Sequence, residues 1–154
     1  MRPVSHILFS PLVGYVGFLA TGSFMVALCA AVTTVAMDLD HLVDFFLFSP
    51  RPVALNRFLE PGNANTWKRL VFALHGYELM LFLTVISHLT GNAVMWGVTV
   101  GAWIHLLMDE YGNRRRHQQT VIPPAFYFFF YRASRGFARE RISKVRESTI
   151  EHKS

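Results

Sequence analysis

The chain has 154 residues, of which 52% are hydrophobic and only 16% are charged, and its formal net charge is +5. Soluble domains usually carry about 25% charged residues, so length and composition together predict one membrane-embedded domain. The single cysteine, Cys29, excludes a disulfide framework, and the sequence has no G-x-G-x-x-G or P-loop motif that would support nucleotide binding.

The first apolar block covers residues 7–37, which include no Asp, Glu, Lys, Arg or His. It exceeds the roughly 20 residues that cross a bilayer core, and it is too long for the apolar part of a cleaved signal peptide. The block can form one long tilted helix or two short helices broken near Thr21-Gly22-Ser23. Two helices would return the N-terminus to the side of the membrane where Asp38 emerges.

Two further membrane helices are predicted on either side of a tight turn at Thr90-Gly91-Asn92. The later elements are, in chain order, a polar connection (49–68), a helix (69–89), a second helix (93–108), an aromatic cluster (126–131) and a charged, helical tail (132–154). The aromatic cluster is expected at the level of the lipid headgroups, where aromatic rings are favoured. The predicted fold class is therefore all-α, an integral membrane bundle of three to four membrane helices with a basic C-terminal helix.

The basic residues predict the orientation of this bundle. Fourteen of the fifteen Lys and Arg lie after residue 50, and none lies in the turn at residues 90–92. By the positive-inside rule, the ends of the helices opposite this turn face the cytoplasm, and Arg2 favours the same side for the N-terminus. We expect residues 1–131 to form the membrane domain and residues 132–154 a basic cytoplasmic tail that can bind anionic membrane lipid. Because topology accounts for the basic residues, no nucleic-acid partner is predicted.

Acidic residues gather beside histidines at the predicted cytoplasmic ends of the helices. The three groups are Asp38-Leu39-Asp40-His41 with Asp44, then His75-Gly76-Tyr77-Glu78, and then His105-Leu106-Leu107-Met108-Asp109 with Glu110. Residues three or four apart share a helix face, and a hairpin centred on Gly91 brings position 75 level with position 107. Three separately encoded groups are therefore expected to converge on one face of the membrane.

These groups have the chemistry of a divalent metal site. An ionised carboxylate inside a bilayer costs at least about 2.5–3.5 kcal/mol on insertion scales, and Glu78 is expected more than one turn inside an apolar helix, so it needs a partner, a proton or a metal. Imidazoles with carboxylates suit zinc, manganese or iron, and the lack of a cysteine pair argues against a purely structural zinc site. One or two ions could be bound, and a two-metal site with ions about 3.5–4 Å apart activates water in many phosphoesterases.

Four motifs, taken in order, resemble the YdjM-type inner-membrane proteins, which are called metal-dependent hydrolases and are related at a distance to zinc-dependent phospholipase C and nuclease P1. The motifs are His6-Ile-Leu-Phe-Ser, Asp38-Leu39-Asp40-His41, a histidine at position 75, and His105-Leu106-Leu107-Met108-Asp109, within residues 5–112. The family usually has two histidines in a His-Arg-Gly-x-Thr-His-Ser stretch, whereas this chain has His75 followed by Gly76-Tyr77-Glu78.

The resemblance implies a set of metal ligands, namely His6, Asp38, His41, His75, His105 and Asp109. Asp40, Asp44 and Glu78 compete for the remaining ligand positions and for the role of general base, and Glu78 is favoured as a ligand that replaces the missing histidine. If Glu78 does not replace that histidine, the site is altered or inactive. The resemblance implies hydrolysis but no particular substrate. The leading hypothesis is hydrolysis of a phosphoester, such as a lipid headgroup or another small molecule, at the cytoplasmic face of a bacterial inner membrane.

Two other functions remain open. An ion or proton transporter would place ionisable groups near the middle of the membrane, where Glu78 is expected to lie although most of the other groups are at one end. A non-catalytic membrane scaffold would use the metal only to join helices.

Overall fold

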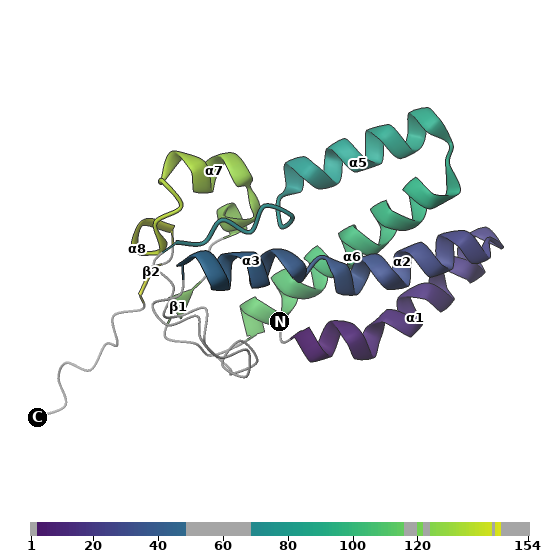
Figure 1. Cartoon of the computed structure of the whole chain (residues 1–154), viewed down its shortest axis with the longest axis horizontal. Coiled ribbons are helices and arrows are strands. Elements are labelled where there is room, and N and C mark those ends of the chain that lie inside the picture. The colour runs from purple at the N-terminus through teal and green to yellow at the C-terminus, as the bar shows by residue number, and fades with distance from the viewer. Residues whose placement is uncertain (1–2, 49–68, 116–119, 122–123, 143, 146–154) are drawn as a thin grey trace, which may run out of the picture.

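The computed structural model describes residues 3–48, 69–115, 120–121, 124–142 and 144–145, and this part of the chain is all-α apart from one pair of two-residue strands. The helices are α1 (Pro3–Thr21), α2 (Phe24–Ala36), α3 (Leu39–Phe48), α5 (Tyr77–Thr90), α6 (Ala93–Arg115), the 3-10 helix η2 (Pro124–Tyr127), α7 (Phe129–Ser134) and α8 (Arg139–Ile142). The strands β1 (Thr120–Val121) and β2 (Lys144–Val145) pair antiparallel. Figure 1 shows the α1–α2 and α5–α6 turns at one end of the molecule and α7 and α8 at the other.

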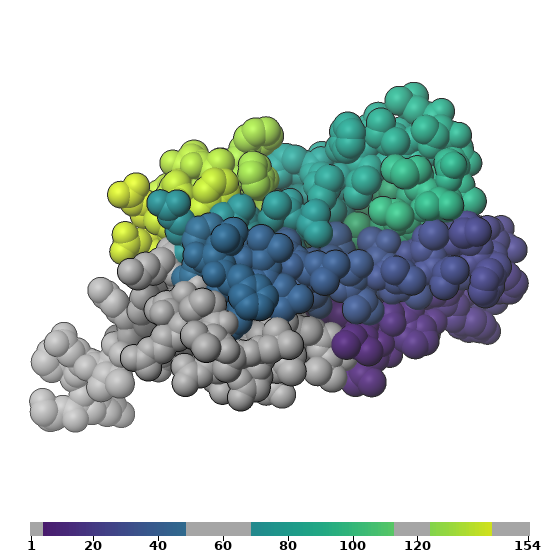
Figure 2. Space-filling view, in the orientation of Figure 1, coloured from purple at the N-terminus to yellow at the C-terminus, as the bar shows by residue number. Residues whose placement is uncertain are grey.

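The first apolar block forms two helices, which confirms the second of the two predicted arrangements. Gly22 adopts a left-handed φ of 66° between α1 and α2, and the Ser23 hydroxyl accepts a hydrogen bond from the Val26 amide at the start of α2. Helices α2 and α3 continue in nearly one line and form one strip of the surface (Figures 1 and 2). Among the described residues, the run Phe24–Phe48 is the single one long and apolar enough to cross a membrane, a property that soluble core helices and signal sequences share.

Helices α2 and α6 approach each other closely through glycines. Gly97 and Gly101 are one turn apart on α6, a spacing that lets two helix backbones come near each other. A Cβ on Gly97 would lie 2.6 Å from the Cβ of Cys29, and a Cβ on Gly101 would overlap the carbonyl oxygen of Ala30. The close approach also lets Thr34 of α2 bond to α6, because its hydroxyl donates to the Gly101 carbonyl and its own carbonyl accepts from His105 Nδ1.

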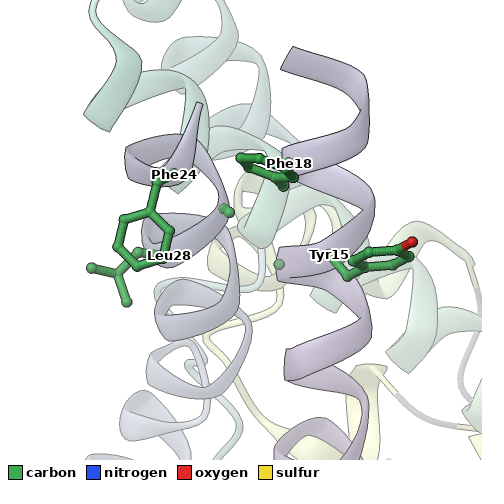
Figure 3. Close-up of a pocket in the computed structure, with 6 residues that line it drawn as sticks. Tyr15, Phe18, Phe24 and Leu28 are labelled. Carbon is green, nitrogen blue, oxygen red and sulfur yellow. The ribbon is translucent and has the colours of Figure 1, made fainter. Parts of the chain in front are cut away.

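Near the α1–α2 turn, the two helices border an open, apolar surface hollow of about 360 Å³ (Figure 3). Its walls include Tyr15 and Phe18 from α1 and Phe24 and Leu28 from α2. The lining has no imidazole or carboxylate, so this hollow lacks the donors of a metal site.

The predicted helix at residues 69–89 is wrong in its first eight residues, because α5 begins only at Tyr77. Residues 69–76 form an irregular segment in which Phe72 has a positive φ of 40°. The amides of Val71, Phe72 and Leu74 bond to the carboxylates of Asp44 and Asp40, so these amides are not available to a helix. The helix predicted at 93–108 is longer than expected and continues to Arg115.

The predicted helical tail is only partly confirmed, because the described residues after 131 form two short helices and a strand in place of one helix. They contain the end of α7, the four residues of α8 and strand β2, and Gly136 and Phe137 break the chain between the two helices with φ values of 63° and 56°. The expected boundary between the membrane domain and the tail, at residue 131, falls inside α7. In the aromatic cluster, Phe126 and Tyr127 are only 4% and 2% exposed and belong to the core, whereas Phe128 and Phe130 are 47% and 72% exposed. The position of the cluster at the lipid headgroups stays a prediction. The connection at residues 49–68 lies outside the described residues.

Candidate metal centre

Six of the expected metal ligands meet at the end of the bundle opposite the two helix turns. They come from the start of α1, from the α2–α3 junction and α3, from the irregular segment 69–76, and from α6 (Figure 1). Two groups of donors are formed, His6 with His105 and Asp109, and Asp38 with His41 and His75, and in each group the donor atoms lie within 4.8 Å of one another. These buried groups could hold a metal ion.

The first group combines the N-terminal helix with α6. His6 Nε2 lies 3.1 Å from Asp109 Oδ1, and His105 Nε2 lies 3.8 Å from Asp109 Oδ2. The rings of His6 and His105 stack at a centroid distance of 4.0 Å. His6 and His105 are 0% exposed and Asp109 is 3% exposed, so water is nearly excluded from this group.

The second group adjoins the first. His75 Nε2 lies 3.4 Å from Asp109 Oδ2, and His105 Nε2 lies 3.7 Å from Asp38 Oδ1. Asp38 Oδ1 is in turn 4.0 Å from His41 Nδ1, but this nitrogen donates to Asp40 Oδ1 at 2.8 Å and would have to give up that proton to bind an ion. Donor atoms of a tetrahedral zinc site with bonds of about 2.0–2.2 Å lie roughly 3.3–3.6 Å apart. The observed spacings are close to this value, so small movements would bring the donors into contact with an ion.

The hydrogen bonds behind two of the histidines decide which nitrogen faces the centre. His105 Nδ1 donates to the carbonyl oxygen of Thr34 at 2.7 Å, and His75 Nδ1 donates to Asp40 Oδ2 at 2.9 Å. A carbonyl or carboxylate oxygen can only accept, so each ring carries its proton on Nδ1 and directs the lone pair of Nε2 inward. The two Nε2 atoms are nevertheless only 2.9 Å apart. Two lone pairs at this distance repel unless a proton or a metal cation lies near them.

In the metal-free protein a proton can take this place. Burial alone lowers the pKa of His75, but its hydrogen bonds with Asp109 and Asp40 outweigh burial and raise the pKa to about 9. His75 is therefore an imidazolium at neutral pH when no metal is bound, and its Nε2 proton can be shared with His105 Nε2. A divalent cation would replace this positive charge.

Asp40 and Asp44, expected as further ligands or as the general base, lie behind the centre and hold segment 69–76. Asp40 Oδ1 accepts from His41 Nδ1 at 2.8 Å, and Asp40 Oδ2 accepts from the Leu74 amide at 2.9 Å as well as from His75. Asp44 Oδ2 accepts from the amides of residues 71 and 72 at 2.7 and 3.0 Å. Neither carboxylate belongs to the two donor groups, and Asp40 instead orients two of the histidines.

Glu78 is neither deep in a helix nor in a donor group. It lies in the first turn of α5, and its carboxylate accepts from the amides of Phe129 and Phe130 at 2.9 and 3.1 Å. The missing second histidine of the family motif is therefore not replaced by Glu78 in this structure.

No family model matches the chain, and no curated protein or solved structure is significantly similar to it. The resemblance to YdjM-type hydrolases stays a prediction, and function has to be inferred from the geometry of the site.

Two residues that contact the site could not be recognised as such from the sequence. Thr34 serves through its backbone carbonyl, which any residue type would supply, although a threonine in an apolar helix is a weak signal. Arg132 donates from Nη2 to the carbonyl oxygen of His75 at 3.1 Å, but in the sequence it belongs to a run of basic residues that predicts a solvated tail.

Proposed function

We propose that this protein is an integral membrane protein that binds one or two divalent metal ions, with zinc favoured over manganese and iron, and hydrolyses a phosphoester at the cytoplasmic face of the membrane. The observation that supports the metal most strongly is the pair of Nε2 atoms, from His75 and His105, at 2.9 Å. Asp109 beside them supplies negative charge. Imidazole nitrogens and carboxylate oxygens are typical zinc ligands, and these two nitrogens would have to move apart to roughly 3.3–3.6 Å to bind one ion in a tetrahedral site.

Membrane insertion is supported by the apolar exterior of the helices. Large apolar side chains are exposed on every long helix, for example Leu8 at 74%, Phe24 at 71%, Leu47 at 66%, Phe82 at 61% and Leu107 at 52%. Soluble monomers rarely expose so much contiguous apolar surface. Together with the run Phe24–Phe48 and the shorter apolar helices Ser5–Thr21 and Tyr77–Thr90, this favours a bundle of three to four membrane helices, and the basic residues of the sequence favour a cytoplasmic position for the site.

Hydrolysis is supported by the more exposed edge of the centre. The side chains of Asp38 and His41 are 13% and 21% exposed, whereas the other four ligands are almost completely buried. Asp38 Oδ2 is buried and has no hydrogen-bond partner among the described residues, so this oxygen is free to bind an ion or to accept a hydrogen bond from water held by that ion. A bound divalent ion would lower the pKa of that water and polarise a phosphoryl oxygen.

A lipid-like substrate is supported by a groove beside the centre. The groove has a volume of about 380 Å³, and its walls are apolar side chains of α3 and of segment 69–76, including Leu39, Val43, Leu47 and Leu74. Asp40, which orients His75, belongs to its lining. A phosphoester bound at Asp38 and His41 could place an apolar chain in this groove.

The proposal is tested by metal analysis and by hydrolysis of phosphodiesters. Detergent-purified protein should contain about one or two equivalents of metal and should cleave bis(p-nitrophenyl) phosphate or a phospholipid in mixed micelles. His105→Ala and Asp109→Asn should lose both metal and activity. His88→Ala is the matched control, because His88 is exposed in the last turn of α5. Equal metal content in all four proteins would exclude the centre.

The burial of the centre favours one alternative, a structural metal that joins helices. Structural zinc sites are closed, whereas catalytic sites keep an open position, and His6, His75, His105 and Asp109 are all at most 3% exposed. Metal content that depends on His105 without hydrolysis of either phosphodiester would favour this alternative over the enzyme.

A further inference from the structure

The guanidinium of Arg132 on α7 is fully buried, although no carboxylate in the described part of the chain pairs with it directly. The residue is 0% exposed, and its Nη2 donates to the carbonyl oxygen of His75 at 3.1 Å. Nε and Nη1 have no hydrogen-bond partner among the described residues. The guanidinium instead lies over the rings of Phe126 and Phe129, at 5.2 and 5.8 Å from their centroids.

Burying a cation in this way is costly, and nearby carboxylates reduce the cost. Burial lowers the pKa of Arg132 to about 10, against the opposing influence of Asp40, Glu78 and Asp44. Arg132 therefore remains charged at neutral pH. Arg132 and Asp40 bind different groups around His75. Arg132 donates to the His75 carbonyl, whereas Asp40 accepts from the His75 ring and from the Leu74 amide.

A second contact, in the reverse direction, joins α7 to the first turn of α5, which directly follows segment 69–76. Glu78, two residues after Gly76, accepts from the first amides of α7, those of Phe129 and Phe130. The space between the two contacts is narrow, because a Cβ on Gly76 would lie 3.2 Å from Glu78 Oε2, 3.3 Å from the Cβ of Phe129 and 3.7 Å from Arg132 Nη2. Segment 69–76 and α7 are therefore docked on each other at the residue that follows His75.

This docking matters because His75 does not lie in a helix. Its amide donates to the carbonyl of Phe72 at 2.9 Å, but no helical ladder fixes the segment, so the direction of the ring depends on side-chain contacts. Asp40 holds the ring and the preceding amide, and Arg132 holds the carbonyl.

We propose that Arg132 is a positioning residue of the metal centre, which keeps the imidazole of His75 in register with His105 and Asp109 by holding the His75 carbonyl. This inference rests on the metal centre proposed above. It makes the C-terminal segment part of the site rather than a separate tail. Loss of an outer contact of this kind typically weakens metal binding by about tenfold to hundredfold.

The test compares Arg132→Met with Arg135→Met in the full-length protein. Arg135 is the matched control, because it is also a basic residue next to α7 that stacks on an aromatic ring, Tyr131 at 5.3 Å, but it is exposed. Cobalt(II) affinity and the visible spectrum of the bound ion are measured for each protein. Hydrogen exchange of residues 72–80 is measured without metal.

Arg132→Met should bind cobalt about tenfold to hundredfold more weakly, with a changed spectrum and faster exchange in residues 72–80, and Arg135→Met should match the wild type. Unchanged affinity and spectrum in Arg132→Met, with or without faster exchange, would overturn the positioning role while leaving the metal centre intact. No cobalt binding by the wild type would instead refute the centre itself. If Arg132→Met does not fold, Arg132→Lys, which keeps the charge but loses the planar fork, is judged by the same criteria.

Discussion

At the scale of single residues, the centre depends on which nitrogen of each histidine carries a proton. A histidine binds metal through the nitrogen whose lone pair is free, and the partner of its other nitrogen decides which one that is. Thr34 and Asp40 offer only acceptors to Nδ1 of His105 and His75. The Nε2 atoms of both histidines therefore point toward each other, and a proton and a metal ion compete for the position beside them.

This competition predicts how metal affinity depends on pH. The pKa of His75 is raised from 6.5 to about 9 in the folded, metal-free protein, so the stabilisation from its imidazolium is complete below pH 6.5 and is lost as pH rises to 9. Metal must displace this proton, so affinity should rise between pH 6.5 and 9 by up to about tenfold per pH unit and should then level off. Competition with a chelator at several pH values measures the metal affinity.

Asp40→Asn is the informative variant for this prediction. Because the Asp40 carboxylate helps to raise the pKa of His75, the asparagine should move the rise in affinity to lower pH. An affinity in the wild-type protein that stays constant between pH 6.5 and 8.5 would contradict a protonated His75.

At the scale of helices, the approach of α6 to α2 sets the position of His105. Gly101 precedes His105 by one turn, and a Cβ there would overlap the Ala30 carbonyl. We expect Gly101→Ala to lower the free energy of unfolding by about 1–3 kcal/mol, because overpacking outweighs the roughly 1 kcal/mol that alanine gains over glycine in helix propensity. Denaturant unfolding in detergent measures the change.

Gly17→Ala in α1 is the control for this prediction. The nearest atom to a Cβ at that position is the Ala27 Cα at 3.7 Å, an ordinary contact, so this variant should be as stable as the wild type or more stable. Equal losses of stability in both variants would show that the α2–α6 contact is not the tight one.

Helix patterns in the sequence predicted the parts of the fold that depend on local chain properties. The hairpin turn at Gly91 follows from its turn residues, and the break at Gly22 and Ser23 is one of the two arrangements that the first apolar block allowed; the structure has both. His75 does lie beside His105, but the helical register that predicted this does not hold, because His75 precedes α5. Segment 69–76 could not be predicted, since its amides are held by carboxylates more than 25 residues earlier in the chain.

The same limit applies to the site residues. Sequence spacing brought six ligands to one end of the bundle, but it did not separate donors that face the centre from those that face the backbone. Asp40, Asp44 and Glu78 are carboxylates like Asp38 and Asp109, and only the fold assigns the first three to amide hydrogen bonds.

At the scale of the whole molecule, the centre adds a link where packing is uneven, because α2 packs extensively on both α1 and α6, whereas α1 and α6 have few contacts with each other. α1 packs mainly on α2, and α5 mainly on α6, whereas the donor groups join α1, the α2–α3 junction, segment 69–76 and α6 at one end. An ion bound there would hold the four segments together even in the absence of catalysis. Metal binding should therefore be coupled to global stability and not to one helix alone.

This coupling predicts a large effect of metal on thermal unfolding. A ligand at 100 times its Kd stabilises the folded state by about 2.7 kcal/mol, and each kcal/mol raises the Tm of a chain of this size by about 2–4 °C. Zinc added to metal-free protein in detergent should thus raise Tm by about 5–10 °C. Asp109→Asn should lose most of this increase, because Asp109 contacts both His6 and His75, while His88→Ala should keep it. An increase that survives in Asp109→Asn would mean that zinc acts elsewhere on the protein, and the absence of any increase in the wild type would mean that the four segments are held by packing alone.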